Sequence, residues 1–378
     1  MPVHFTRRQF LKGAAVLSAA FLSSGLIGKK PFSRTSLANV GYPKEARHYK
    51  KIDKKTVMCL LCPRRCLLTE GERSFCRVRE AKGGKLYSLV YELPCAIHVD
   101  PIEKKPLYHM LPASSSFSIA TAGCNLRCKF CQNWQISQES PENTSNRYLP
   151  CSAVVSEAAR HRCRSIAYTY SEPIVFYEYM VDIAKIARER GIKNVLVTGG
   201  FIDPGAPLEE LCRVIDAANI DLKGFSDKYL REICGERLDV LLEVIKRTKE
   251  SGVWVELTNL IVPTLNDDPG MIREMCRWIR ENLGADTPLH FSRFWPMYKL
   301  RNLPPTPLET LRSARQIAYD AGLHFVYIGN VPEESASNTL CPHCKKILIR
   351  RAGYSVLSNN ITGSGCKFCG TKIAGIWE

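Results

Sequence analysis

The 378-residue sequence is short of acidic residues and has no apolar run long enough to predict a membrane-spanning helix with assurance. Its 37 aspartates and glutamates stand against 53 lysines and arginines, which leaves a formal net charge of +16. No tract alternates lysine or arginine with aromatic residues, so nucleic acid is not expected as a partner and the charge indicates a moderately basic surface. The hydrophobic fraction of 45% and the charged fraction of 24% are typical of a soluble globular protein.

Acidic residues are absent from positions 1–38, which predict a targeting segment. Arg7 and Arg8 precede an apolar run, 14–27, that is too short and too rich in small residues for a spanning helix. A twin arginine before such a run resembles a Tat signal, and Ser36-Leu37-Ala38 is a candidate cleavage site. We therefore expect Tat-dependent export and no transmembrane segment in the mature chain, with a cytoplasmic location as the alternative.

Cysteine is abundant, and 11 of the 17 cysteines fall into three tight groups. Their C-x2-C spacings favour metal sites over a disulfide framework and imply metal insertion in a reducing compartment. The groups are Cys59, Cys62, Cys66 and Cys76, then Cys124, Cys128 and Cys131, then Cys341, Cys344, Cys366 and Cys369. The scattered cysteines, which we interpret as reduced core thiols, are Cys95, Cys151, Cys163, Cys212, Cys234 and Cys276.

The middle group, Cys124-Asn-Leu-Arg-Cys128-Lys-Phe-Cys131, follows an apolar run that predicts a strand. A [4Fe-4S] cluster is normally held by cysteine thiolates. Three thiolates on one loop can hold three irons and leave the fourth open to a ligand, as a catalytic zinc site keeps one position open. The alternatives are a structural zinc loop and cysteines that have this spacing by chance.

The two outer groups each contain four cysteines, which would close the coordination sphere of a metal. The N-terminal group fits either structural zinc or an auxiliary iron–sulfur cluster, so a structural or electron-relay role is expected there. At the C-terminus, two C-x2-C pairs separated by 21 residues predict a zinc ribbon. Rubredoxin-like iron is the alternative for that site.

Strand-like and helical patterns alternate from residue 117 onward. Helical periodicity is clear over 269–283 and 308–321, and strands are predicted over 117–122, 165–170, 194–198, 219–222, 253–262, 289–294 and 324–328. This alternation predicts a parallel sheet with right-handed crossovers. We expect an α/β fold, a partial (β/α)6 TIM-like barrel with its chemistry at the carboxyl ends of the strands.

Changes in composition divide the chain into four parts. A basic, polar stretch over 39–55 predicts a linker, and residues 85–91 predict a strand within the cysteine-rich segment. The expected parts are the Tat signal at 1–38, a metal-binding segment at 39–108, the barrel at 109–335 and the ribbon or rubredoxin-like module at 336–378.

Polar or compact residues stand at the ends of successive predicted strands. A carboxylate in such a place can accept charge-assisted hydrogen bonds from an ammonium group. These residues, which together predict a ligand site beside the middle cysteine group, are Ser171, Glu172, Thr198, Asp221, Lys223 and His290. The charged segment 100–109 predicts either an interdomain connector or, alternatively, a lid or a substrate contact.

These motifs resemble the radical SAM superfamily, in the branch related to pyruvate formate-lyase activating enzymes. Within that branch the chain is similar to the AmmeMemoRadiSam system radical SAM protein. The matching segments, which run from about residue 57 to the end, are 59–66, 100–109, 121–134, 221–224, 290–294 and 327–332. Two departures are Tyr170-Ser171-Glu172, where Gly-Gly-Glu is frequent, and Thr198-Gly199-Gly200, where asparagine is expected before the last glycine.

The resemblance implies that Cys124, Cys128 and Cys131 ligate a [4Fe-4S] cluster whose open iron binds S-adenosylmethionine (SAM). Reductive cleavage of SAM would give a 5′-deoxyadenosyl radical that abstracts hydrogen from an unknown protein or small-molecule substrate. The implied SAM-binding residues are Phe130 near the adenine, Ser171, Glu172 and Thr198 toward the methionyl end, and Asp221, Lys223 and His290 at its flanks. No residue is assigned a catalytic role.

The resemblance also implies partners. A low-potential electron donor is expected, and the subfamily name implies Memo-like and AMMECR-type proteins beside a protein substrate. One alternative function is a radical SAM enzyme that modifies nucleic acid, and another is a non-catalytic iron–sulfur carrier or zinc-binding module. Cleavage of SAM by the reduced protein would separate the enzymes from the carrier.

Overall fold

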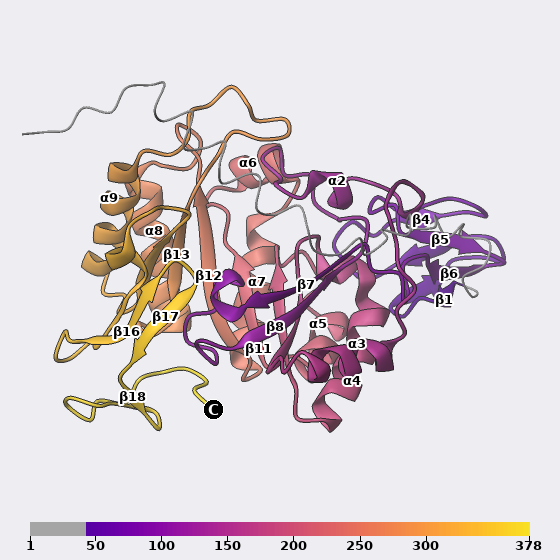
Figure 1. Cartoon of the computed structure of the whole chain (residues 1–378). Coiled ribbons are helices and arrows are strands. Elements are labelled where there is room, and N and C mark those ends of the chain that lie inside the picture. The colour runs from indigo at the N-terminus through magenta and orange to yellow at the C-terminus, as the bar shows by residue number, and fades with distance from the viewer. Residues whose placement is uncertain (1–42) are drawn as a thin grey trace, which may run out of the picture. The chain divides into compact units, whose positions relative to one another are not determined.

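The protein is represented by a computed structural model that describes residues 43–378. The predicted Tat segment, 1–38, lies outside the described residues. The main element is an eight-stranded sheet (Figure 1). From edge to edge its strands are β14 (Val326–Gly329), β13 (Leu289–Arg293), β12 (Trp254–Ile261), β11 (Ala217–Asp221), β10 (Lys193–Thr198), β9 (Ser165–Tyr168), β8 (Ser115–Ala120) and β7 (Ala96–Pro101).

The strands from β8 to β14 are parallel to their neighbours, whereas β7 pairs antiparallel with β8. The predicted α/β fold with a parallel sheet and a partial barrel is therefore confirmed. The sequence patterns missed β7, which precedes the alternating region and adds an edge strand through the register Ala96↔Ala120 to Pro101↔Ser115. The strand order is linear, so the sheet has two edges.

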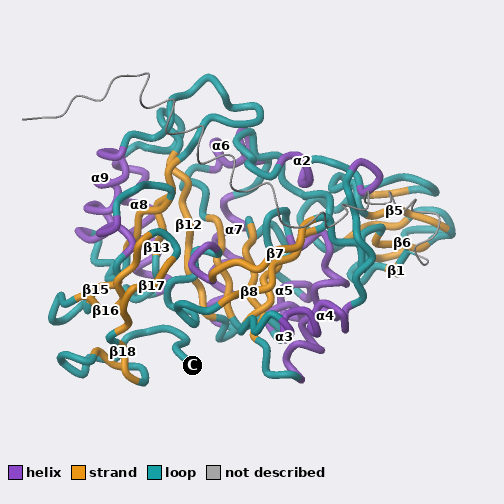
Figure 2. The backbone as a smooth tube through the Cα atoms, in the orientation of Figure 1, coloured by secondary structure: helices purple, strands orange, loops and turns teal. Residues whose placement is uncertain are grey.

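Helices connect the parallel strands and cover the outside of the sheet, as Figures 1 and 2 show. They are α3 (Cys151–Arg160), α4 (Tyr177–Glu189), α5 (Ala206–Cys212), α7 (Leu238–Glu250), α8 (Pro269–Leu283) and α9 (Leu308–Asp320), with the short α2 (Trp134–Ser137) and α6 (Asp227–Tyr229) in loops. Among residues 43–378, no helix has the length and apolar character needed to cross a bilayer.

Helix α8 illustrates how local sequence sets these elements. The Asp268 side chain accepts a hydrogen bond of 2.7 Å from the Met271 backbone N–H, and Pro269 occupies the first turn. Gly284 follows the helix with φ of 92°. The buried face consists of Ile272, Met275, Cys276, Ile279 and Leu283. The predicted helix over 269–283 is thus confirmed, because its cap and its apolar period agree.

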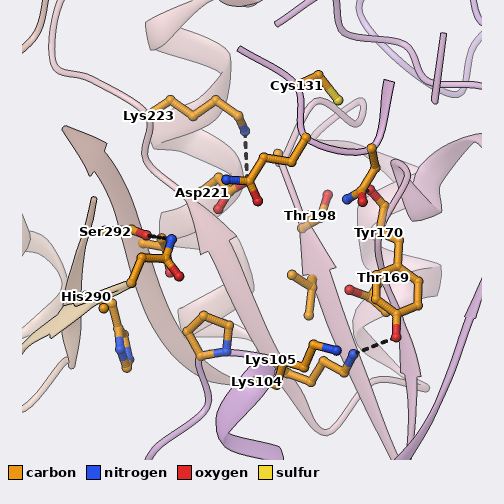
Figure 3. A pocket seen from close by; sticks show the side chains of 18 of the residues that line it. Lys104, Lys105, Cys131, Thr169, Tyr170, Thr198, Asp221, Lys223, His290 and Ser292 are labelled. Atoms are coloured by element: carbon orange, nitrogen blue, oxygen red, sulfur yellow. Dashed lines mark hydrogen bonds and ion pairs between the residues drawn. The ribbon is translucent and has the colours of Figure 1, made fainter. Parts of the chain in front are cut away.

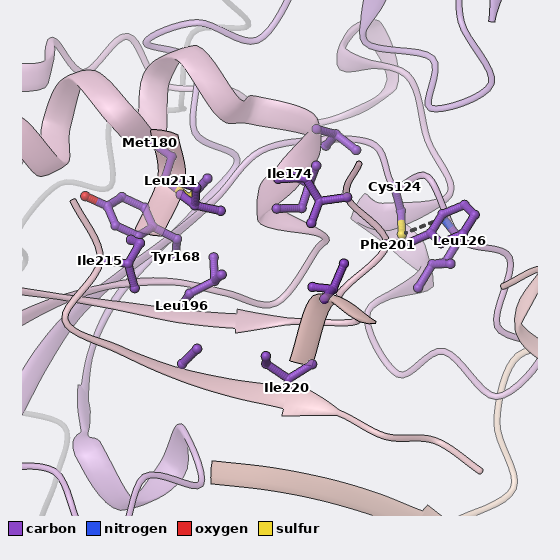
Figure 4. Packing of buried hydrophobic residues seen from close by; sticks show 14 of the residues in the cluster. Cys124, Leu126, Tyr168, Ile174, Met180, Leu196, Phe201, Leu211, Ile215 and Ile220 are labelled. Atoms are coloured by element: carbon purple, nitrogen blue, oxygen red, sulfur yellow. Dashed lines mark hydrogen bonds between the residues drawn. The ribbon is translucent and has the colours of Figure 1, made fainter. Parts of the chain in front are cut away.

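The core lies between the sheet and its covering helices. Figure 4 shows part of this hydrophobic cluster, in which Met180 of α4 and Leu211 of α5 pack near Leu196 of β10. Cys124, Leu126 and Phe201 lie together at one end of the same view. The loop that carries the middle cysteine group is therefore seated on the barrel core.

Two small sheets precede the barrel. One contains β1 (Lys44–Glu45), β6 (Lys85–Ser88) and β5 (Arg79–Lys82), and the other contains β2 (Tyr49–Lys51), β3 (Val57–Cys59) and β4 (Leu67–Leu68). The prediction of a linker over 39–55 is wrong for the described part, because β1 and β2 belong to these sheets. The Arg47 guanidinium also forms ion pairs with Asp182 and Glu210, which attach this stretch to α4 and α5.

The C-terminal segment forms a three-stranded sheet and a hairpin. Its strands are β15 (Thr339–Leu340), β16 (Ile347–Ala352), β17 (Ser355–Asn359), β18 (Ile361–Thr362) and β19 (Gly365–Cys366). The buried Arg351 guanidinium donates 2.8 Å to the Tyr108 carbonyl oxygen and 2.9 Å to the Thr339 hydroxyl. Arg351 therefore fixes this segment to the connection between β7 and β8.

Candidate functional site

A cavity of about 940 Å³ lies at the carboxyl ends of the parallel strands (Figure 3). It gathers most of the residues predicted from the strand ends and from the middle cysteine group, namely Cys124, Cys128, Cys131, Ser171, Glu172, Thr198, Asp221, Lys223 and His290. Phe130 is not among its lining residues, because its side chain is buried in the main hydrophobic cluster.

The cysteine loop follows β8 and is fixed by backbone contacts. The Arg127 N–H donates 2.8 Å to the Cys234 carbonyl oxygen, and the Lys129 N–H donates 2.9 Å to that of Ile233. Gly123 enters the loop with φ of 92°, where a Cβ atom would lie 2.6 Å from the carbonyl oxygen of Cys76. Glycine is therefore required for this close approach to the N-terminal cysteine segment.

Glu172 follows β9 and presents a buried carboxylate beside the loop. Its Oε2 accepts 2.8 Å from the Gly199 N–H, and its Oε1 accepts from the Thr198 hydroxyl. Burial raises the pKa of Glu172, while the bonds from Thr198 and Gly199 oppose that rise. These donors orient the carboxylate and leave acceptor capacity on its two oxygens, which together offer about four lone-pair sites.

Lys223 provides a buried positive charge on the same side of the cavity. Its Nζ lies 3.1 Å from Asp221 Oδ2, and Figure 3 shows both side chains near Thr198. Burial disfavours the charge, but Asp221 and its other anionic neighbours raise the pKa of Lys223 well above its usual value. A Cβ atom at Gly199 would lie 3.0 Å from this Nζ, so the missing side chain there admits the lysine.

His290 lies on β13, and its ring is positioned by Glu256, a residue that the sequence patterns did not predict. Glu256 on β12 is fully buried and accepts 2.7 Å from both His290 Nε2 and the His109 backbone N–H, and 3.0 Å from the Tyr108 N–H. The only sequence signal was a carboxylate in an otherwise mostly apolar parallel strand, Trp254–Ile261.

The segment 100–109 contributes to the cavity wall. Asp100 accepts 2.8 Å from Lys104 and 2.6 Å from Lys105, and also accepts from the Tyr170 hydroxyl. Burial lowers the pKa of Lys105 to about 8, although Asp100 opposes the shift. In Figure 3 these lysines lie at the opposite end of the pocket from Cys131. Of the two predictions for this segment, its place in the cavity favours contact with a ligand.

Two further residues beside the loop were missed. Cys234, one of the predicted core thiols, is buried as expected but lies within hydrogen-bonding reach of Cys128. Glu236 is also buried, and neither of its carboxylate oxygens has a hydrogen-bond partner in the described structure. Cys234 is the last residue of a π-helical turn, Leu230–Cys234, and Glu236 follows that turn. No spacing motif in the sequence marks either residue.

The C-terminal cysteines converge on a single point. The Sγ atoms of Cys341 and Cys369 are 3.6 Å apart, and those of Cys344 and Cys366 are 3.8 Å apart. All four lie within 4.8 Å of one another. Four thiolates at about 2.3 Å from one zinc ion would be about 3.8 Å apart, so this group fits a single tetrahedral metal ion.

The cavity residues also fit the group expected at the middle cysteines. Three buried or half-buried thiols line one cavity with an oriented carboxylate and a buried lysine. Three thiolates match an iron–sulfur cluster with one open iron. The Lys223–Asp221 pair and the Glu172 carboxylate match a ligand that carries both an ammonium and a carboxylate group.

Comparisons with known proteins agree with this geometry. A family model described as the Radical SAM superfamily matches residues 118–279. The chain is 46% identical over 332 residues to Uncharacterized protein MJ0808 of Methanocaldococcus jannaschii, covering 87% of this chain and 98% of that protein. It is 26% identical over 161 residues to the pyruvate formate-lyase-activating enzyme of Clostridium pasteurianum, covering 42% of this chain and 66% of that enzyme.

A solved structure, a domain of the pyruvate-formate lyase-activating enzyme from Bacteroides vulgatus, aligns with 44% of this chain and 99% of that domain. The sequence identity is 20% and the TM-score is 0.38.

Proposed function

We propose that this chain, which belongs to the radical SAM superfamily, cleaves SAM reductively and uses the resulting radical to abstract hydrogen from a protein or small-molecule substrate. Its similarity to pyruvate formate-lyase-activating enzymes supports an activating type of reaction. The observation that carries the proposal is the single cavity that joins Cys124, Cys128 and Cys131 to the oriented Glu172 carboxylate.

Each part of the cavity has a role in this reaction. The three cysteines would hold the [4Fe-4S] cluster, which with SAM supplies one-electron cleavage to a 5′-deoxyadenosyl radical. Glu172 would bind the SAM ammonium group, since Thr198 and Gly199 already orient its oxygens. Lys223 offers a cation for the SAM carboxylate, and Asp221 keeps that lysine charged.

The remaining cavity is available to a second reactant. A volume of about 940 Å³ is near the upper end for ordinary ligand pockets, so a substrate can share the cavity with SAM. Lys104, Lys105 and Tyr170 lie at the end away from Cys131 and would contact that substrate. The buried walls would exclude water from the radical.

The direct test is 5′-deoxyadenosine formation by the anaerobically reconstituted, chemically reduced full chain. Replacement of Cys124, Cys128 and Cys131 by alanine should abolish the product, which is measured by liquid chromatography and mass spectrometry. Cys212→Ala, in which a half-buried thiol away from the cavity is lost, serves as the matched control and should retain activity. Undiminished product from the triple variant would refute the proposal.

Glu172→Gln tests the SAM-binding role more finely. The change keeps the side-chain shape but removes one charge-assisted hydrogen bond, which should cost about 1.5–3 kcal/mol, or about one to two decades of SAM affinity. Equilibrium binding of SAM measures the effect, and the iron–sulfur absorption should stay unchanged. If affinity and cleavage match the unaltered protein, Glu172 serves only as the N-terminal cap of the following turn.

A further inference from the structure

The N-terminal cysteines are arranged differently from the C-terminal ones. Among residues 43–378, only the C-terminal group brings three or more cysteine, histidine or carboxylate ligand atoms within 4.8 Å of one another. The thiols of Cys59, Cys62, Cys66 and Cys76 are therefore too widely spread for one tetrahedral zinc ion, whose thiolates would be about 3.8 Å apart. The thiols of the middle cysteine group, Cys124, Cys128 and Cys131, also do not all lie within 4.8 Å of one another.

Although they are spread, the four N-terminal thiols face a common space. All four cysteines line one small cavity, together with Arg64, Arg79 and Asn125. Thiolates that ligate different irons of one cluster stand further apart than thiolates on one metal ion, since the cluster itself lies between them. Four thiols around a shared cavity have the arrangement that such a cluster needs.

The cavity is also supplied with hydrogen-bond donors. The Phe75 backbone N–H donates 3.5 Å to Cys66 Sγ, and the Ser74 hydroxyl lies 3.0 Å from Cys76 Sγ. Arg79 is buried, and its Nε atom has no hydrogen-bond partner in the described structure. Cationic and N–H groups stabilise the net negative charge of a cluster held by four thiolates.

The N-terminal cysteine segment packs directly against the loop that carries Cys124, Cys128 and Cys131. The Arg64 Nε donates 3.1 Å to the Asn125 carbonyl oxygen, and the Arg127 guanidinium donates to the carbonyl oxygen of Phe75. Two guanidinium groups also contact the Phe75 ring, since the guanidinium carbons of Arg64 and Arg127 lie 4.0 and 3.8 Å from its centre. The N-terminal site is therefore a direct neighbour of the catalytic site.

We infer that Cys59, Cys62, Cys66 and Cys76 ligate a second [4Fe-4S] cluster rather than zinc. The inference goes beyond the proposed function, because it concerns a separate metal site. Four cysteine ligands close this cluster, so its irons bind neither SAM nor substrate. The chain then holds two clusters of different kinds, an open one in the barrel and a closed one beside it, and a single metal ion in the ribbon.

The test is a metal count combined with Mössbauer spectroscopy on full-length protein loaded anaerobically with ⁵⁷Fe. The unaltered chain should contain about eight iron atoms and about one zinc ion, as expected for two [4Fe-4S] clusters and one ribbon site. The variant with Cys124, Cys128 and Cys131 changed to alanine should keep half of the iron. Its remaining cluster should show [4Fe-4S] parameters that do not respond to SAM.

A second variant removes ligands of the N-terminal site and leaves the middle cysteine group unchanged. Cys59→Ala/Cys62→Ala should also lose half of the iron but keep a SAM-responsive cluster. If this variant does not fold, Cys66→Ser, at a half-buried position, should lower iron content while zinc stays constant. Cys212→Ala is the control and should keep all of the iron.

Two outcomes would overturn the inference. One is a triple variant that contains about two zinc ions and no iron, which would make the N-terminal site a zinc site. The other is a Cys59→Ala/Cys62→Ala variant with undiminished iron. A triple variant that keeps its cluster while the unaltered chain fails to cleave SAM would refute the proposed function alone, so the two failures are distinguishable.

Discussion

The four C-terminal thiols lie within 4.8 Å of one another, whereas the four N-terminal thiols surround a cavity without such convergence. Both groups begin with a C-x2-C pair, so their local sequences are alike. They differ in their second halves: Cys366 and Cys369 repeat the pair on another hairpin, while Cys66 and Cys76 stand singly on either side of β4. We therefore expect the separation of the thiols, more than the number of cysteines, to distinguish the metal sites of the two groups.

A buried arginine attaches each cysteine segment to the barrel, and here too the two differ. Arg79 forms a buried ion pair of 2.7 Å with Glu178 of α4. The Arg351 guanidinium donates to the Ser337 and Tyr108 carbonyl oxygens and to the Thr339 hydroxyl. Its Nε also lies 3.7 Å from Oε1 of the buried Glu103. The N-terminal attachment therefore rests on a hydrogen-bonded ion pair, whereas the C-terminal one combines hydrogen bonds to neutral acceptors with a longer ion pair to Glu103.

The largest expected effect is metal loss from the ribbon. Cys341→Ser/Cys366→Ser should remove on the order of 10 kcal/mol of local folding free energy, because metal binding and folding are coupled in modules of this size. Hydrogen exchange should then show loss of protection over 339–378, while the barrel and the iron content remain unchanged. A ribbon that stays protected without metal would contradict this prediction.

Next in size is Arg79→Met. The substitution leaves the Glu178 carboxylate buried without its partner and should cost about 3–5 kcal/mol of stability, measured by urea unfolding. The matched double variant Arg79→Met/Glu178→Met should recover most of the loss, since it removes both charges. A double variant no more stable than Arg79→Met would show that the guanidinium acts through other contacts.

Arg351→Met should have a smaller effect. It removes hydrogen bonds to neutral acceptors, at a cost of about 1–3 kcal/mol, and should increase exchange in the ribbon without releasing its metal. Burial raises the pKa of the neighbouring Glu103, so this carboxyl group can become neutral when the arginine is lost. Lys372→Met, an exposed change on the same segment, is the control and should alter neither quantity. Equal effects of the Arg79 and Arg351 substitutions on global unfolding would break the contrast between the two attachments.

The smallest expected effect on the folded protein comes from Arg7→Lys/Arg8→Lys. We propose that residues 1–38 direct Tat-dependent export after all three cysteine groups have received their metals. The variant should accumulate in the cytoplasm with unchanged iron and zinc, measured by cell fractionation and metal analysis. Cytoplasmic retention of the unaltered chain would instead place the enzyme's work in that compartment.

Much of the barrel was predictable because its signals are local. The apolar period over 269–283 predicted α8 to the residue, and six strand–helix alternations predicted a parallel sheet. Edge strand β7 and the strands within 43–55 were not predicted, because their short segments are stabilised by distant partners. Arg47, for example, pairs with Asp182 and Glu210 far along the chain.

The candidate site divides in the same way. The strand-end rule predicted Glu172, Thr198, Asp221 and Lys223, which line one cavity. Glu256 was missed, because its partners His109 and His290 lie on other elements and no spacing rule links the three. Phe130 was predicted as a site residue, but its side chain packs in the main hydrophobic cluster and not on the cavity wall. Its position between two cysteines of the loop does not decide which way the side chain packs.

The sequence by itself determined the three cysteine groups, the order of strands and helices, and the polar residues at the strand ends. These follow from covalent spacing and from the periods of strand and helix, which need no knowledge of distant contacts. Only the tertiary structure decided how far apart each set of thiols stands, because that distance depends on how the loop at Cys76 packs against Gly123 and on how two hairpins meet at Cys341 and Cys369. Spacing along the chain marks the candidate metal sites, and packing sets the distances between their thiols.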